Sequence, residues 1–389
     1  MFFIISVIAL ILLSLAGNSV FYLSASKQLR KNRIFRTIWG IETIGVALLP
    51  VILVSLTFYT GLSTDSRIFM WGVFLTLLFI VPLICFMIYA LVAVFPFNQR
   101  IRRVTAGIGW LMMGIIASAI LYGGIVGRKK IVVEKEVIYT SRLPESFDKL
   151  KIVQISDLHL GSIRHNPEYI QAIVDSVNNQ HPDLIFFTGD LVNSKASEAE
   201  PFRSLLHSLK AKEGVYSVLG NHDYAYYHRW NSEEERLNNV AQLIALEKKA
   251  GWDLLNNEHR ILSRNDDSIV IAGVENWGEK RFGQQGDLSK ALTNISDSSF
   301  ILLLSHNPVH WRKEVLPETN VDVTFSGHTH AMQMQIGNFS PSEWLYKEWS
   351  GLYQENNQYL YVNRGTGFVI FPARIGAYPE ISFIELRHK

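Results

Sequence analysis

The chain has 389 residues, of which 48% are hydrophobic, and its charges are distributed unevenly. Residues 1–127 hold nine Lys and Arg against two Asp and Glu, whereas residues 128–389 hold 28 and 33, so the two parts carry net charges of +7 and −5. The charge-poor first part excludes a purely soluble protein, and the acidic second part offers no basic surface for nucleic acid, which we do not expect as a partner.

The only cysteine, Cys85, lies in an apolar stretch of the first part. A single thiol can form neither an intrachain disulfide nor a thiolate metal cluster. Any metal ion bound by this chain must therefore be held by nitrogen and oxygen ligands.

Four apolar stretches in the first part are long enough to cross a bilayer, which requires about 20 helical residues. They are residues 2–23, 37–60, 68–95 and 104–126. We predict a transmembrane anchor of four helices over residues 1–127, followed by a linker and lead-in over residues 128–149. The first stretch also fits a cleaved signal peptide, because residues 14–16 are small enough for a cleavage site, although no basic segment precedes them.

Lysine and arginine residues in the short loops set the predicted orientation of this anchor. Eight of them lie between the first and second or the third and fourth stretches: Lys27, Arg30, Lys31, Arg33, Arg36, Arg100, Arg102 and Arg103. The opposite side receives six: Arg67, Arg128, Lys129, Lys130, Lys135 and Arg142. The count places the loop between the first and second stretches and the loop between the third and fourth in the cytoplasm. It therefore predicts a multi-pass protein of the cell membrane with its large domain on the outer face.

The predicted helices contain a single acidic or basic residue, Glu42. Ion and substrate pathways through a bilayer are marked by ionisable residues inside the membrane. We therefore expect the helices to act as an anchor, and a transporter is disfavoured.

Alternating strand and helix patterns begin near Lys151. Residues 151–156 are predicted as a strand, Pro167 opens an amphipathic helix, and residues 183–188 return as a buried strand. The apolar face of that helix consists of Ile170, Ile173, Val174 and Val177. This βαβ unit, together with later apolar runs that end at residues 219, 305 and 325, predicts an α/β fold.

Polar side chains follow five of the predicted strands. They are Asp157 and His159, then Asp190, then Asn221, His222 and Asp223, then His306, and finally His328 and His330. Because ligands bind outside the carboxyl ends of strands in open α/β sheets, we expect these loops to meet. Carboxylate, imidazole and amide groups suit divalent Mn, Fe, Zn or Mg, and seven such ligands are too many for one tetrahedral ion but fit two ions that share a carboxylate.

These motifs, in this order, resemble the calcineurin-like metallophosphoesterase family over about residues 150–386. The chain's ending, residues 361–367 and 374–381, resembles the membrane-associated bacterial branch of that family. The resemblance implies a layered α/β/β/α sandwich over residues 150–389 and metal-dependent cleavage of a phosphomonoester, phosphodiester or pyrophosphate bond.

Carried over position by position, the family pattern implies two metal sites that share Asp190. The first site would consist of Asp157, His159, Asp190 and His330, and the second of Asp190, Asn221, His306 and His328. The resemblance further implies that His222 protonates the leaving oxygen while Asp223 holds its ring. Relatives often have Gly-Gly-Gln after the last histidine, where this chain has Ala331, Met332 and Gln333.

Three further residues are weaker candidates for substrate contact. Arg364 and Arg374 could clamp a phosphate through paired hydrogen bonds, or they could form ordinary ion pairs. Trp349 lies in an apolar segment, residues 341–353, in which Leu345, Trp349 and Leu352 have helical spacing, and which could contact lipid or pack on its own core.

The leading hypothesis is a membrane-anchored two-metal hydrolase of phosphoester or pyrophosphate bonds, with a substrate that could be lipid-linked. The alternative is a catalytically silent membrane scaffold or sensor that keeps its metals for structure. Nothing in the sequence indicates an oligomeric state.

Overall fold

The computed structural model describes residues 11–19, 22–23, 25, 27–60, 67–92, 98–163, 166–278 and 284–389. The chain divides into two compact units. One consists of residues 1–126 and 370–373, and the other of residues 127–369 and 374–389. Each unit is described by itself below.

The first unit is helical. Its helices are α2 (Lys27–Lys31), α3 (Arg33–Thr60), α4 (Arg67–Val92) and α5 (Gln99–Ile125). Within the described residues, α3, α4 and α5 contain the three stretches that are long and apolar enough to cross a membrane. Residues 11–19 are also helical, but the first predicted span, residues 2–23, lies partly outside the described residues, so three of the four predicted spans are found.

Two prolines and a small apolar core mark the packing of these helices. Pro50 lies inside α3 and Pro82 inside α4, as expected for apolar helices whose neighbours stabilise them. The core consists of Val46, Ile80, Leu83 and Phe86. Many other large apolar side chains of this unit are exposed, which is typical of helices that face lipid.

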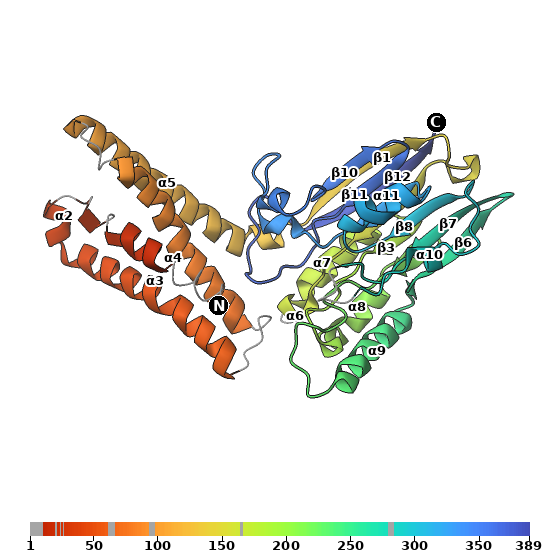
Figure 1. Cartoon of the computed structure of the whole chain (residues 1–389), viewed down its shortest axis with the longest axis horizontal. Coiled ribbons are helices and arrows are strands. Elements are labelled where there is room, and N and C mark those ends of the chain that lie inside the picture. The colour runs from red at the N-terminus through yellow and green to blue at the C-terminus, as the bar shows by residue number, and fades with distance from the viewer. Residues whose placement is uncertain are drawn as a thin grey trace. The chain divides into compact units, whose positions relative to one another are not determined.

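The second unit contains two six-stranded mixed sheets (Figure 1). The first has the order β1 (Val132–Thr140), β12 (Glu380–His388), β2 (Leu150–Ile155), β3 (Leu184–Phe187), β4 (Val215–Ser217), β5 (Asp253–Leu254). The second has the order β10 (Gly351–Glu355), β11 (Gln358–Val362), β9 (Val323–Ser326), β8 (Phe300–Leu304), β7 (Asp267–Gly273), β6 (Glu258–Arg264). Strands β2 to β5 run parallel, and so do β7, β8, β9 and β11.

The described α-helices of this unit are α6 (Leu160–Ile163), α7 (Pro167–Asn178), α8 (Arg203–His207), α9 (Glu233–Lys249), α10 (Leu288–Ala291) and α11 (Leu316–Glu318). Of these, α7 and α9 are long and the others are short. Helix α7 begins where predicted, because Asn166 accepts a hydrogen bond from the Tyr169 amide and Pro167 fits the first turn. Its predicted apolar face is buried. In α9, Ser232 caps the start, three glutamates lie in the first turn and two lysines in the last, which complements the helix dipole.

The main core lies between the two sheets, where inward side chains of both form one hydrophobic cluster. Phe186 of β3 and Phe325 of β9 meet there in a T-shaped pair with ring centroids 5.0 Å apart, an arrangement worth about 0.5–1.5 kcal/mol beyond burial. The outer face of the second sheet is covered by Leu288, Trp311 and Val315, and α7 contacts β12 of the first sheet. This is the layered α/β arrangement that the family resemblance implies.

The predicted linker and lead-in, residues 128–149, contains a strand of the first sheet, because β1 pairs in parallel with β12 from Val132 opposite Glu380 to Thr140 opposite His388. In the segment 341–353, where three apolar residues have helical spacing, a short 3₁₀ turn covers Pro341–Trp344 and β10 begins at Gly351. Gly351 has a φ of 82°, which ends any helical continuation.

Candidate metal centre

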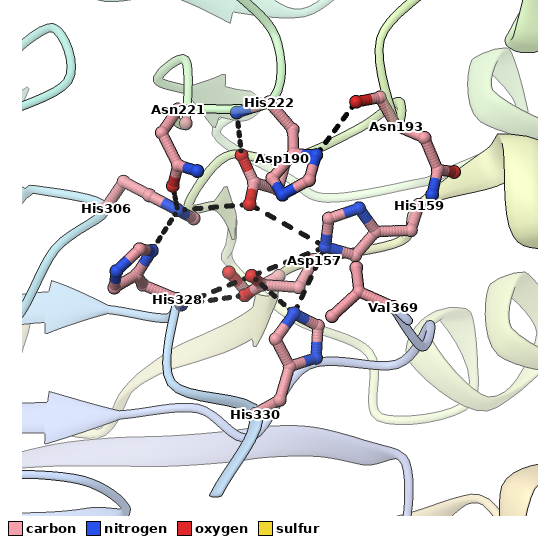
Figure 2. Close-up of polar contacts among 12 residues, drawn as sticks. Asp157, His159, Asp190, Asn193, Asn221, His222, His306, His328, His330 and Val369 are labelled. Carbon is pink, nitrogen blue, oxygen red and sulfur yellow. Dashed lines mark hydrogen bonds and ion pairs between the residues drawn. The ribbon is translucent and has the colours of Figure 1, made fainter. Parts of the chain in front are cut away.

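Five loops bring the predicted ligands together, and each follows a strand (Figure 2). Asp157 and His159 follow β2, Asp190 follows β3, Asn221 and His222 follow β4, His306 follows β8, and His328 and His330 follow β9. The first sheet therefore supplies both carboxylates, and the second sheet supplies three imidazoles. The convergence that was expected from the strand ends is confirmed.

The backbone of these loops is unusual. Asp157, His159, Asp190, His328 and His330 have φ values of 53°, 46°, 58°, 71° and 50°. Left-handed conformations cost non-glycine residues of order 1 kcal/mol or more, and they concentrate at functional sites because they aim side chains that a regular strand would direct elsewhere.

Two glycines, Gly220 and Gly327, allow their loops to approach the carboxylates closely. A Cβ on Gly220 would lie 2.2 Å from Asp190 Oδ1, and one on Gly327 would lie 2.3 Å from Asp157 Oδ2. The glycines of the Gly-Asn-His-Asp and Gly-His-Thr-His motifs therefore leave room for the carboxylates.

The closed cluster consists of Asp157, His159 and His330, whose side chains are all buried. His159 Nε2 lies 3.1 Å from His330 Nε2. Asp157 Oδ1 lies 3.3 Å from His330 Nε2 and 3.9 Å from His159 Nε2. Three ligand atoms thus surround one point.

The open cluster consists of Asn221, His306 and His328, and here His328 is partly exposed. His306 Nε2 lies 3.0 Å from Asn221 Oδ1 and 3.2 Å from His328 Nδ1. Asp190 lies between the two clusters (Figure 2), with Oδ2 3.3 Å from His306 Nε2 and 3.6 Å from His159 Nε2. Its position is that of a carboxylate shared by both.

The charges within the site depend on one another. Burial would raise the pKa of Asp157 and of Asp190, but the surrounding imidazoles lower the pKa of both below the ordinary value. Burial opposes charge on His306 too, yet Asp190 raises its pKa to about 9. The pKa of His328 falls to about 3 because of burial and the neighbouring His306. The site therefore keeps two ionised carboxylates in contact with positive charge.

This donor set fits divalent cations. In each cluster two ring nitrogens face each other at 3.1 or 3.2 Å beside a buried carboxylate, an arrangement that needs a proton or a cation between the lone pairs. Groups of His and Asp ligand atoms lie within 4.8 Å of one another. Nitrogen and oxygen donors without thiolate are compatible with Mn, Fe, Zn or Mg.

His222 lies beside Asp190 and His159, and its ring is held in place. The ring Nδ1 is 2.8 Å from the carbonyl oxygen of Asn193, and the ring stacks on Tyr227 with centroids 4.1 Å apart. The His222 backbone amide donates to Asp190 Oδ1 over 2.8 Å. The side chain is partly exposed, so a bound substrate can reach it.

The predicted role of Asp223 as the partner of the His222 ring was wrong. The Asp223 carboxylate instead accepts hydrogen bonds from the backbone amides of Asp190, Val192 and Gly220 at 2.8, 3.2 and 2.9 Å. Burial and the charge of Asp190 raise its pKa to about 7. Asp223 therefore fixes the loop that carries Asp190, and the Asn193 carbonyl takes the place beside His222.

The two candidate arginines are occupied within the domain. Arg374 is fully buried and donates to the carbonyl oxygens of Gly367, Ala377 and Arg364 at 2.8, 3.0 and 2.9 Å. Its Nη2 also lies 3.1 Å from His330 Nδ1, on the ring face away from the cluster. Arg374 thus supports a ligand of the closed cluster, and the geometry gives it no direct path to a phosphate.

Arg364 and Trp349 likewise face the protein. Arg364 forms ion pairs with Glu380 and Glu134. Trp349 is buried against Ala331 and Ala377. The structure therefore brings the seven predicted metal ligands and His222 together, but it does not bring these three substrate candidates into the site.

The segment after His330 keeps a glycine-like backbone without glycine. Ala331, Met332 and Gln333 have φ values of 48°, 47° and 58°. The Gly-Gly-Gln of relatives would adopt this conformation with less strain. This chain therefore holds a left-handed backbone here with side chains in place of the two glycines.

Sequence reasoning missed three residues that support the ligands. Tyr227 Oη accepts a hydrogen bond from Asn221 Nδ2 over 2.8 Å, and Tyr346 Oη lies 3.2 Å from His328 Nε2. Asn193 acts through its backbone carbonyl, for which no side-chain signal exists. The position of Tyr227, six residues after Asn221 in the same loop, was the only available indication.

The family profile described as calcineurin-like phosphoesterase matches residues 150–332. The uncharacterized metallophosphoesterase YkuE of Bacillus subtilis is 31% identical over 291 residues, which cover 71% of this chain and 95% of that protein. The chain belongs to the calcineurin-like phosphoesterase family.

Two further relatives bear on the membrane part and on the reaction. A zebrafish (Danio rerio) transmembrane protein with metallophosphoesterase domain is 30% identical over 289 residues, 71% of this chain and 62% of its own length. The UDP-2,3-diacylglucosamine pyrophosphatase LpxG of Chlamydia muridarum is 30% identical over 280 residues, 58% of this chain and 81% of its own length. The chain is thus a metal-dependent phosphoesterase, although it spans less than two thirds of the zebrafish relative.

Proposed function

We propose that the protein is a membrane-anchored two-metal hydrolase that cleaves a phosphoester or pyrophosphate bond in a lipid-linked substrate. The observation that carries this proposal is the position of Asp190, whose carboxylate lies between the closed and the open cluster while the His222 ring stands beside His159. Two divalent ions held by these residues would supply Lewis-acid polarisation of a phosphoryl group and activation of water near neutral pH.

Each metal would have four protein ligands. Asp157, His159, Asp190 and His330 would hold one ion, and Asp190, Asn221, His306 and His328 the other. The Tyr227 hydroxyl orients the Asn221 amide so that its oxygen faces the open cluster. Manganese is the first ion to supply in assays, because oxygen and nitrogen ligands accept it readily.

His222 would supply the proton to the leaving oxygen. The Asn193 carbonyl engages Nδ1, so Nδ1 carries a proton and the labile proton of the imidazolium is the one on Nε2. Stacking on Tyr227 fixes the plane of the ring. A partly exposed imidazole with a fixed orientation is suited to general acid catalysis.

The lipid-linked substrate is supported by the helices and by one relative. An anchor of apolar helices does nothing for a freely diffusing ester, but it concentrates the site beside molecules confined to the bilayer. LpxG, by its name, is a pyrophosphatase for UDP-2,3-diacylglucosamine, a lipid-bearing nucleotide sugar. A substrate of that kind combines a cleavable pyrophosphate with acyl chains.

A competitive panel tests this function. Detergent-purified protein with Mn would be offered lipid-linked phosphates and pyrophosphates, UDP-linked acylated sugars and soluble nucleotides, and kcat/KM would be compared. We expect a lipid-bearing substrate to be preferred. Preference for soluble esters would overturn the lipid-linked class, and no hydrolysis of any substrate by metal-loaded protein would favour the silent scaffold.

Orientation is part of the proposal, with residues 127–389 on the outer face. Cysteines at Asn32 and Lys248, introduced separately on a Cys85→Ser background, would be labelled in cells with a membrane-impermeant reagent. We expect labelling at position 248 and none at 32. The reverse pattern would place the site in the cytoplasm, where nucleotide-linked substrates are made.

A further inference from the structure

Four large apolar side chains project into solvent from one segment of the phosphoesterase unit. Ile336 is 64% exposed, Phe339 42%, Trp344 76% and Leu345 67%. We call these four residues the apolar tip. The rings of Phe339 and Trp344 are in edge contact, with centroids 5.9 Å apart, so these two side chains form one apolar surface.

The tip is fastened firmly to the turn that carries two metal ligands. Ser340 Oγ donates to the carbonyl oxygen of Ala331 over 2.7 Å, and Thr329 Oγ1 donates to that of Trp349 over 2.6 Å. Ile336 and Phe339 close a tight turn through mutual backbone hydrogen bonds. Both ends of the segment are therefore tied to the protein, and the exposure of the tip is a property of a built structure.

We propose that the apolar tip inserts into the bilayer in which the helices anchor the chain. The connection between α5 and β1, residues 126–131, reaches about 20 Å at most. The start of β1 therefore stays within that distance of the end of a membrane-spanning helix. Transfer of exposed Trp, Phe and aliphatic side chains from water into the membrane interface is favourable, because it removes apolar surface from water.

The tip segment itself carries an exposed acidic residue, Glu343, and an exposed basic residue, Lys347, which follows the tip by two residues. The connection before β1 adds Arg128, Lys129 and Lys130. Basic residues beside an apolar surface attract anionic lipid headgroups. The proposed occupant is thus the hydrocarbon and headgroup boundary of the membrane.

Insertion would act on the metal centre through Tyr346. This residue follows Leu345 directly, and its hydroxyl lies 3.2 Å from Nε2 of His328, a ligand of the open cluster. A membrane that holds the tip would also hold Tyr346 against His328. The inference rests on the membrane anchor of the proposed function but not on the substrate.

Spin labelling of the full chain in vesicles tests insertion directly. A nitroxide at Leu345→Cys on the Cys85→Ser background would be compared with one at Leu237→Cys, a 53% exposed leucine of α9 in the same unit. The vesicles would contain phosphatidylethanolamine and phosphatidylglycerol. We expect position 345 to collide mainly with oxygen, which concentrates in lipid, and position 237 mainly with a neutral nickel complex in water.

Two outcomes would overturn the proposal. Equal access of the nickel complex to both positions would show that the tip stays in water. Dipolar broadening at position 345 that grows with the protein-to-lipid ratio would show that a second copy of the chain covers the tip. Neither outcome depends on catalysis, so they are distinguishable from failure of the proposed hydrolysis.

A double variant, Trp344→Ser with Leu345→Ser, extends the test to turnover. We expect metal content and hydrolysis of soluble bis(p-nitrophenyl) phosphate to stay within about twofold of wild type, while turnover of a lipid-linked substrate in vesicles falls by about tenfold or more, since membrane contact scales with buried apolar area. Equal turnover of the lipid-linked substrate by the variant and wild type would contradict a role for the tip.

Discussion

The closed and open clusters contain similar ligands but differ in their surroundings. Asp157, His159 and His330 are buried, and the guanidinium of Arg374 lies behind His330. In the open cluster His328 is partly exposed, and so are the two tyrosines that touch Asn221 and His328. The difference makes the open cluster the more accessible of the two.

Loss of Asp190 tests whether the two clusters are one site. Asp190→Asn removes the charge that both clusters share, so we expect loss of most metal and of nearly all hydrolysis of bis(p-nitrophenyl) phosphate. The loss should exceed the roughly 10–100-fold caused by removing a residue that only supports a ligand. Asp175→Asn, on the exposed face of α7, is the matched control. Retention of both ions by Asp190→Asn would show that the two clusters bind metal independently of Asp190.

Substitution of His222 tests the proposed general acid. His222→Ala should keep both metals and lower turnover by about 10²–10⁴-fold, the usual range for general acid catalysis. Esters with good leaving groups should suffer less than esters with poor ones, because they need no proton. His207→Ala serves as control. Equal losses for both ester classes would instead assign His222 to phosphate binding.

Tyr227 tests whether the open cluster depends on its support. Tyr227→Phe keeps the ring against His222 but removes the oxygen that accepts from Asn221. We expect one metal to bind about 10–100-fold more weakly while the other is unchanged. Tyr226→Phe, one residue earlier, is the control. Equal weakening of both ions would contradict the separate support of the two clusters.

Substitution of Glu247 tests a buried carboxylate outside the candidate ligand set through its effect on stability. Its carboxylate accepts from Ser217 Oγ, and burial, with the charge of Asp223, raises its pKa to about 8 from the ordinary 4.5. Between these two pKa values the folded state keeps the Glu247 proton while the unfolded chain releases it. The contribution of protonated Glu247 to the free energy of unfolding is therefore full below about pH 4.5 and is lost as the pH rises to about 8.

Glu247→Gln should therefore raise the melting temperature of the detergent-solubilised chain at pH 8.5 and have little effect at pH 5. The expected gain in free energy of unfolding at pH 8.5 is several kcal/mol, from about 1.4 kcal/mol per pKa unit. Glu234→Gln, exposed on the same helix, is the control. A melting difference that is the same at both pH values would contradict the raised pKa.

The ligand set was predictable because its residues directly follow apolar strands. Asp157, Asp190 and His306 each come after a buried run, and parallel strands end at a common edge. The sequence pattern alone therefore placed the ligands near one another. The family resemblance then divided them between two metals.

What the sequence did not predict depends on contacts between distant residues. β1 looks like a linker because most of its side chains are not buried, and its partner β12 lies at the far end of the chain. Asp223 resembled a partner for its neighbour His222, but its oxygens accept backbone amides of another loop. Arg374 resembled a phosphate ligand, but it satisfies buried carbonyl groups.

The metal content of the wild-type chain tests the central claim most directly. Protein purified without chelator, with Mn supplied, would be assayed by elemental analysis and for hydrolysis in the same preparation. Two clusters that share Asp190 predict close to two ions per chain and hydrolysis that a chelator removes. Active protein with fewer than one ion per chain would contradict the account.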